Sequence, residues 1–292
     1  MFPAHDPRFR VRFITVDPGY TIRVVETGDA AATEVVVCLH GWACSSYSFA
    51  GVLPAVAARG ARGVAFDLIG HGLSDKPDDA KCYTLDAMTD VVARVVEALG
   101  ISRAAFVGHS MGGAIAARYA VRYPERVRRL VLAAPVGVGN ALPLRLAIGC
   151  TPRIMNPLLP YLVPGWAIPI VLRMAFGALR RPTREDREEY WAPTQFPAFF
   201  RAMRALLHGF DWRAGERSGP DGLAGITVPT TLLYGSRDHF VVHDTARRYA
   251  RIIPHVTVEE IPGCGHVVPE EVPELVANVA TDGAPVGQSR DS

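Results

Sequence analysis

Short hydrophobic runs alternate with amphipathic stretches over most of this chain. Residues 35–39 and 63–67 are almost entirely apolar, which is typical of parallel strands that are buried on both faces. Residues 104–107 and 130–133 have the same character. Between Met88 and Leu99 the apolar positions recur at spacings of three and four, which predicts a helix with one buried face.

Further strands and helices are predicted towards the two ends of the chain. Two strand-like runs near residues 10–13 and 20–26 flank the turn Asp17-Pro18-Gly19. Near the other end, strands at 230–234 and 256–259 flank a helix at 245–252. Alternating strands and helices form parallel sheets covered on both faces, with right-handed crossovers. The pattern therefore predicts an α/β fold with a mostly parallel, doubly wound sheet.

The alternation stops between residues 136 and 224. This segment is rich in aromatic side chains and arginine, and it contains several prolines: Pro143, Pro152, Pro157, Pro160, Pro164 and Pro169. We interpret it as a helical cap inserted between two strands of a core made of residues 1–135 and 225–281. Residues 282–292 are polar and are predicted to be a flexible tail. Apolar side chains of the cap are expected to roof the site and to set selectivity.

A candidate nucleophile lies between the strand at 104–107 and a predicted helix. The sequence there is Gly108-His109-Ser110-Met111-Gly112, a G-x-S-x-G pentapeptide. A sharp strand-to-helix turn strains its central residue and needs small neighbours, because chain segments pass closely. Such a turn would expose the Ser110 hydroxyl above the sheet.

A serine hydroxyl needs a base within hydrogen-bond reach, and the base needs an orienting carboxylate. Asp238 and His266 each follow a predicted strand in the C-terminal part of the chain. The carboxyl ends of parallel strands meet in one crevice, so we predict that these two residues act with Ser110. Asp244 is a weaker candidate, because it lies just inside the following helix.

The oxyanion of a tetrahedral intermediate needs hydrogen-bond donors as well. The backbone N–H of Met111 directly follows the nucleophile at a helix N-terminus. The backbone N–H of Trp42, in the loop after residues 35–39, is the expected second donor. His40, His71 and His109 are expected to brace loops.

Composition indicates which partners, cysteine chemistry and cellular location to expect. The chain has 292 residues, 49% of them hydrophobic, and a formal net charge of +2, which argues against a nucleic-acid partner. Its five scattered cysteines favour free thiols over a disulfide framework or a metal site. We find no secretion signal and no uninterrupted membrane span, and therefore expect a cytoplasmic protein.

Several motifs together resemble those of the α/β-hydrolase fold superfamily, over essentially the whole chain. They are Leu39-His40-Gly41-Trp42, Asp67-Leu68-Ile69-Gly70-His71-Gly72-Leu73-Ser74-Asp75-Lys76-Pro77, Gly108-His109-Ser110-Met111-Gly112-Gly113, Gly235-Ser236-Arg237-Asp238 and Gly263-Cys264-Gly265-His266. The resemblance implies a catalytic triad of Ser110, Asp238 and His266, and no metal or organic cofactor.

The substrate is less well defined by this resemblance. Haloalkane dehalogenases and epoxide hydrolases have an aspartate nucleophile, where this chain has Ser110. Carbon–carbon bond hydrolases usually have a Gly-Pro-Gly-type loop, where this chain reads Trp42-Ala43-Cys44-Ser45-Ser46. We therefore expect hydrolysis of an ester or related acyl bond in a small-to-medium hydrophobic substrate. Carbon–carbon bond or thioester cleavage, cofactor-free perhydrolysis and slow or non-catalytic ligand binding remain alternatives.

Overall fold

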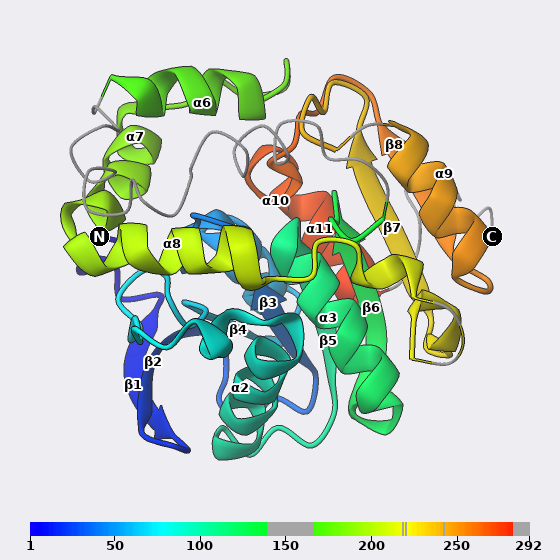
Figure 1. Ribbon diagram of the computed structural model, residues 1–292, viewed down its shortest axis with the longest axis horizontal. Helices are drawn as coiled ribbons and strands as arrows, with labels where there is room; N and C mark the ends of the chain where they lie inside the picture. Colours follow the sequence, from blue (N-terminus) through cyan, green and yellow to red (C-terminus); the bar gives the residue numbers. More distant parts are fainter. Residues whose placement is uncertain (139–165, 218, 220, 242, 283–292) are drawn as a thin grey trace.

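An eight-stranded sheet runs through the centre of the protein (Figure 1). The computed structural model describes residues 1–138, 166–217, 219, 221–241 and 243–282. The strands are β1 (Arg10–Val16), β2 (Tyr20–Thr27), β3 (Val35–Leu39), β4 (Arg62–Phe66), β5 (Ala104–His109), β6 (Val127–Ala133), β7 (Thr230–Gly235) and β8 (Thr257–Ile261). Their spatial order is β1-β2-β4-β3-β5-β6-β7-β8. β1 and β2 pair antiparallel, β2 is antiparallel to β4, and the strands from β4 to β8 are parallel.

Helices cover both faces of this sheet, as the alternating pattern predicts. Val35, Val37 and Leu39 of β3 lie in one buried hydrophobic layer, whereas Val36 and Cys38 lie in the other. The first layer is covered by α2 (Leu85–Ala98), α3 (Met111–Arg122) and α9 (His243–Ile252), and the second by α1 (Val52–Ala58) and α11 (Pro273–Thr281). The predicted α/β fold with a mostly parallel sheet is confirmed.

Helices also fill the described part of the insertion between β6 and β7. They include α6 (Ala167–Ala175), α7 (Arg184–Trp191) and α8 (Pro197–Gly209). Phe199, Met203 and Leu206 of α8 are buried in the same hydrophobic layer as α2 and α3. Much of the first third of the predicted cap, residues 139–165, lies outside the described residues, as does the tail from residue 283. The domain boundaries at 135/136 and 224/225 stay predictions.

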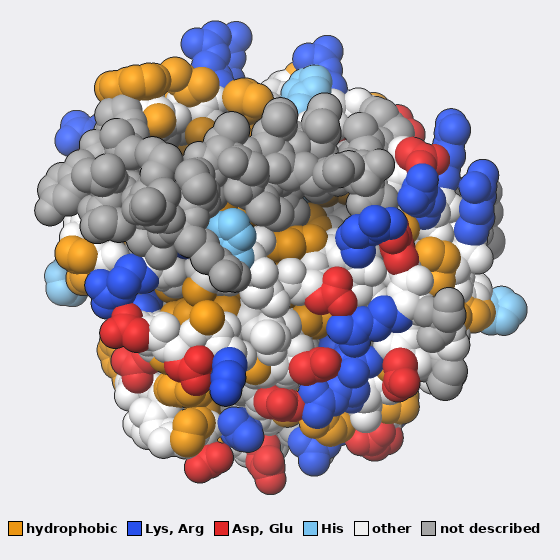
Figure 2. Space-filling model, viewed as in Figure 1, with side chains coloured by type: hydrophobic (Ala, Val, Ile, Leu, Met, Phe, Trp, Pro, Cys, Tyr) orange, Lys and Arg blue, Asp and Glu red, His pale blue; other side chains and the backbone are white. Residues whose placement is uncertain are grey.

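Positive and negative side chains are mixed on the face drawn in Figure 2. Lys and Arg are interspersed with Asp and Glu over the lower half of this face. Apolar side chains of α6 face outward along the upper edge, and Trp166, just before that helix, is 70% exposed. Among the described residues, no helix has the length and apolarity to cross a membrane.

Candidate active site

Ser110 occupies a strained turn between β5 and α3. Its backbone φ is +52°, a conformation that side chains other than glycine rarely adopt. A Cβ atom at Gly108 would lie 2.5 Å from the carbonyl oxygen of Gly112, and a Cβ atom at Gly112 would overlap the carbonyl oxygen of Leu39. Glycine is therefore required at both positions for the turn to form.

The structure brings the three predicted residues Ser110, Asp238 and His266 together. His266 lies in the loop after β8, and its Nε2 atom is 3.1 Å from Ser110 Oγ. Asp238 lies in the loop after β7, and its Oδ2 atom is 2.9 Å from His266 Nδ1. Side chains separated by 156 and 28 positions thus form one hydrogen-bonded chain.

Asp238 is held as a carboxylate. Its Oδ1 atom accepts hydrogen bonds from the backbone N–H groups of Phe240 at 2.8 Å and Val241 at 2.9 Å. Burial by itself opposes ionisation, but His266 and the two N–H groups outweigh it and hold the pKa of Asp238 below its ordinary value of 3.8. An ionised carboxylate only accepts hydrogen bonds, so His266 Nδ1 carries the proton and Nε2 presents its lone pair to Ser110.

Asp244 is not brought to His266. It lies in the first turn of α9, where its Oδ2 atom accepts from Arg248 Nε at 2.8 Å, four residues along the helix. Both side chains are well exposed. Of the two candidate carboxylates, only Asp238 contacts the histidine.

All three histidines that were expected to brace loops form hydrogen bonds with loop backbone. His71 Nδ1 donates to the carbonyl of Ile69 at 3.2 Å, and the other two lie next to the site. His109 Nε2 donates to the carbonyl oxygen of His266 at 2.9 Å, and burial lowers the pKa of His109 to about 3. His40 Nδ1 donates to the carbonyl of Gly41 at 2.8 Å, while its Nε2 accepts the N–H of Leu68 at 2.9 Å. These bonds fix the tautomers of both neutral imidazoles.

The two predicted oxyanion donors lie on segments that flank Ser110. Met111 is the first residue of α3, where a backbone N–H has no acceptor within its own helix. Trp42 follows Gly41, at which a Cβ atom would lie only 3.1 Å from Ser110 Cβ. The indole Nε1 of Trp42 donates to the carbonyl of Met203 at 3.3 Å, which connects this loop to helix α8 of the insertion.

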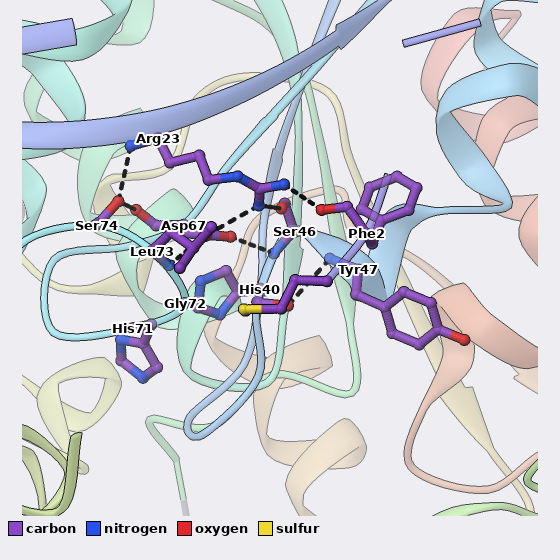
Figure 3. Close-up of polar contacts among 12 residues, drawn as sticks. Phe2, Arg23, His40, Ser46, Tyr47, Asp67, His71, Gly72, Leu73 and Ser74 are labelled. Carbon is purple, nitrogen blue, oxygen red and sulfur yellow. Dashed lines mark hydrogen bonds and ion pairs between the residues drawn. The ribbon is translucent and has the colours of Figure 1, made fainter. Parts of the chain in front are cut away.

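A buried carboxylate connects the loops that follow β3 and β4 (Figure 3). Asp67 accepts the N–H of Ser46 through Oδ1 at 2.8 Å and that of Leu73 through Oδ2 at 2.8 Å. Oδ2 also pairs with Arg23 Nη1 at 3.2 Å. Burial opposes its ionisation, but Arg23 and the N–H groups hold the pKa of Asp67 below its ordinary value. A Cβ atom at Gly72 would overlap this carboxylate, which explains a glycine in the Asp67–Pro77 motif.

Arg23 extends this network to the N-terminal segment. Its guanidinium donates to Ser46 Oγ at 3.1 Å and to the carbonyl of Phe2, and its backbone N–H donates to Ser74 Oγ at 2.9 Å (Figure 3). The ring of Phe2 contacts Tyr47 edge-on. Sequence reasoning assigned no role to Asp67 or Arg23; the Asp67–Pro77 motif was the available signal for Asp67, whereas Arg23 had none.

Helix α7 is joined to the core by hydrogen-bonded side chains. Tyr190 Oη donates to Glu270 Oε1 at 2.5 Å, and burial raises the pKa of Glu270 to about 7. Tyr47 Oη donates to Asp186 Oδ1 at 2.8 Å, and Arg180 donates to the same oxygen at 2.9 Å. No sequence motif indicated these contacts.

Comparison with known proteins gives the same fold, and the named relatives are a hydrolase and a decarboxylase. An uncharacterized hydrolase of Bacillus subtilis, YugF, is 27% identical over 256 residues, 85% of this chain and 89% of that one. A cis-3-alkyl-4-alkyloxetan-2-one decarboxylase of Shewanella oneidensis is 29% identical over 83% of this chain and 79% of its own. The crystal structure of Cfl2 from Burkholderia cenocepacia superposes with a TM-score of 0.81 at 26% identity, over 94% of this chain and 96% of the other.

The match to a family covers most of the chain. Residues 34–169 and 181–273 match the alpha/beta hydrolase fold family, and these ranges include β3 to β8 and the loops that carry Ser110, Asp238 and His266. The sheet order and the helices inserted between β6 and β7 agree with this match. The chain is therefore a hydrolase that belongs to the α/β-hydrolase fold family.

Proposed function

We propose that this protein is a serine hydrolase that cleaves an ester or related acyl bond through an acyl-serine intermediate. The observation that carries the proposal is the hydrogen-bonded chain from Asp238 through His266 to Ser110 at the strained turn. Nucleophile, base and orienting carboxylate are the three groups that acyl transfer to serine requires.

The first half of the reaction follows from the proton positions. Ser110 Oγ attacks the carbonyl carbon while His266 Nε2 takes the hydroxyl proton, and Asp238 stabilises the imidazolium that forms. The N–H groups of Met111 and Trp42 stabilise the oxyanion. His266 then returns the proton to the leaving alcohol, and the acyl group stays on Ser110.

The second half uses water in place of the serine hydroxyl. His266 Nε2 takes a proton from the water as its oxygen attacks the acyl carbon. When the tetrahedral intermediate collapses, that proton passes to Ser110 Oγ, and the acid is released. One water molecule is consumed, the ester bond is broken, and the enzyme returns to its starting state.

The nucleophile favours an acyl substrate over an epoxide or a haloalkane. Opening those substrates through a covalent ester requires a carboxylate nucleophile, whereas position 110 is a serine. The relative from Shewanella oneidensis acts, by its name, on an oxetan-2-one, which is a four-membered cyclic ester. An ester carbonyl is therefore a substrate group that fits both the site and one relative.

Apolar residues on α8 support a hydrophobic substrate of small to medium size. The carbonyl of Met203 on this helix is bonded to the Trp42 indole, and the rings of Phe199 and Phe200 contact edge-on one turn earlier. An acyl chain on Ser110 would gain a few kcal/mol at most from each apolar side chain of the insertion that it contacts.

The test is covalent labelling with a fluorophosphonate. One adduct on the peptide that contains Ser110 is expected, and it should be lost in Ser110→Ala. Ser102→Ala, at an exposed serine just before β5, is the matched control and should label like the wild type. Labelling that survives Ser110→Ala unchanged would refute the proposed nucleophile.

The substrate class is tested with p-nitrophenyl esters of graded acyl length, alongside thioesters and vinylogous diketones. We expect the highest kcat/KM on an ester, with a dependence on acyl length. Faster turnover of the diketones would replace the proposal by carbon–carbon bond hydrolysis. Absence of both labelling and turnover would favour a ligand-binding protein on this fold.

A further inference from the structure

The backbone of the insertion is hydrogen-bonded to the loop that carries the base. The carbonyl oxygen of Ala175, the last residue of α6, accepts the backbone N–H of His266 at 2.7 Å. Three residues later, the N–H of Ala178 donates to the carbonyl of Gly263 at 2.6 Å. We call residues 175–178 the α6 exit and residues 263–266 the His266 loop. The two segments are therefore in direct contact at His266 itself.

One carboxylate oxygen joins the same two segments. Oε1 of Glu271, in α10 (Val268–Glu271), accepts the N–H of Gly177 at 2.9 Å and the N–H of Gly265 at 2.6 Å. The Sγ atom of Cys264 lies 3.6 Å from this oxygen. Glu271 is buried, so without it two backbone donors would lose their acceptor away from water.

The contact leaves no room for side chains. A Cβ atom at Gly177 would overlap the carbonyl oxygen of Gly263 and the nitrogen of Gly265, and would lie 2.6 Å from the carbonyl carbon of Cys264. A Cβ atom at Gly265 would in turn overlap the carbonyl oxygen of Ala175. All these neighbours are backbone atoms, so the clash cannot be relieved by a side-chain rotation.

The opposite side of the His266 loop is bonded to the loop that carries Asp238. The N–H of Gly263 donates to Ser236 Oγ at 2.8 Å, and the N–H of Arg237 donates to the carbonyl of Cys264 at 2.9 Å. The His266 loop is thus held between the Asp238 loop on one side and the α6 exit on the other.

We infer that the α6 exit, together with Glu271, is a positioning element that sets the place of the His266 ring between Ser110 and Asp238. This inference rests on the proposed function, because it assigns a role in the same reaction. It also changes the expectation that the insertion supplies selectivity alone. Gly177 and Glu271 are positioning residues, since they act through His266 and touch no substrate.

The first test compares two glycines of the insertion. Gly177→Ala forces the α6 exit away from the His266 loop, whereas Gly209→Ala, at the end of α8, adds a Cβ atom whose nearest neighbour is the Ala80 carbonyl at 3.7 Å. Displacement of a base by a fraction of an ångström to 1 Å lowers kcat by roughly 10- to 100-fold. We expect this loss in Gly177→Ala at every acyl length, with KM nearly unchanged, and wild-type kinetics in Gly209→Ala.

The second test uses the carboxylate. Glu271→Gln keeps an acceptor oxygen for the two N–H groups and should retain most of kcat, whereas Glu271→Ala removes it and should lose kcat as Gly177→Ala does. Rates are expressed per active site titrated with fluorophosphonate, so a smaller folded fraction does not count as a loss. If Gly177→Ala fails to fold, the comparison of Glu271→Gln with Glu271→Ala still tests the inference.

A spectroscopic readout separates this inference from the proposed function. The proton between His266 Nδ1 and Asp238 gives a downfield ¹H NMR resonance, which should shift or broaden in Gly177→Ala and Glu271→Ala but not in Gly209→Ala. If the wild type neither labels nor turns over esters, the proposed function fails, and the resonance still reports the ring position. Wild-type kcat per site and an unchanged resonance in both variants would overturn the inference.

Discussion

Each histidine in the site carries its proton on the ring nitrogen that faces a group able only to accept a hydrogen bond. The lowered pKa of Asp238 makes it an acceptor, so the proton of His266 lies on Nδ1. The carbonyl of His266 accepts from His109 Nε2, which fixes the tautomer of that buried imidazole as well. His109 is thus held as a neutral ring, whereas the second nitrogen of His266 faces the hydroxyl of Ser110.

Replacing Asp238 by Asn tests this proton arrangement. An amide can donate to Nδ1 and so favour the wrong tautomer, and it does not stabilise the imidazolium, so kcat should fall by roughly 10³- to 10⁴-fold. Asp244→Asn should change kcat little, because Asp244 pairs with Arg248 on the exposed face of α9. Steady-state kinetics on an ester would compare the two, and a larger loss in Asp244→Asn would refute the assignment.

The sequence predicts Ser110, Asp238 and His266 better than it predicts the residues that hold their loops in place. Ser110, Asp238 and His266 lie in short motifs at strand ends, and the rules of parallel sheets then place them at one edge. Glu271 and Gly177 carry no comparable signal, because they are 94 positions apart and meet only in the folded chain. A buried carboxylate that holds backbone N–H groups resembles any other glutamate in the sequence.

At the scale of elements, α7 is attached to α10 by a buried hydrogen bond whose acceptor, the Glu270 carboxyl, has a raised pKa. Tyr190 Oη donates to Glu270 Oε1, and the thiol of Cys44 lies 3.8 Å from the same hydroxyl. Burial raises the pKa of the Glu270 carboxyl from its ordinary 4.5 to about 7. The contact therefore includes a group that changes charge near neutral pH.

This titration predicts how stability depends on pH. The folded-state pKa of Glu270 is raised, so the folded protein binds more protons than the unfolded chain between about pH 4.5 and 7. The resulting stability is fully present below pH 4.5 and is lost as the pH rises through 7. Glu270→Gln should remove this dependence, so the variant gains on the order of 1–3 kcal/mol relative to wild type between pH 5 and 8.

Thermal unfolding at several pH values measures this effect. Glu274→Gln is the matched control, because Glu274 lies next to this region on α11 but its side chain is 74% exposed. The control should keep the wild-type slope of Tm against pH. An unchanged slope in Glu270→Gln would show that another group titrates in this range.

Long elements with a clear separation of apolar and polar positions could be predicted from the sequence, whereas short, uniformly apolar ones could not. The helix predicted at 88–99 has a full amphipathic stripe; α2 begins three residues earlier, at Leu85, and ends one residue earlier, at Ala98. Helices α1 and α11 were not predicted, since they are only seven and nine residues long and consist mainly of alanine, valine and leucine. Short apolar segments of this kind do not distinguish helix from strand.

At the scale of the molecule, helix α8 shares one hydrophobic layer with the sheet. Phe199, Met203 and Leu206 are buried together with Tyr83, in η2 (Ala80–Tyr83), and with α2 and α3. Helix α8 is thus packed into the core, in addition to the hydrogen bond between its Met203 carbonyl and Trp42. This continuity predicts that α8 and the sheet unfold together.

Truncation of one α8 side chain tests this coupling. Phe199 is 4% exposed, so Phe199→Ala should cost about 3–5 kcal/mol and lower Tm by roughly 5–8 °C, with one transition seen by both far- and near-ultraviolet circular dichroism. Phe196→Ala, just before α8 at a ring that is 42% exposed, should have a much smaller effect. Two separated transitions in the wild type would show that α8 unfolds on its own.

The contact between the α6 exit and the His266 loop also determines how members of this family can be recombined. A chimera that exchanges everything between β6 and β7 would pair a foreign α6 exit with the native Gly265 and Glu271, and the two backbones would then match only by chance. Crossover points placed after residue 178 would leave this interface within one parent. Helices α7 and α8 could then be exchanged, while the His266 loop keeps its native contacts with the α6 exit.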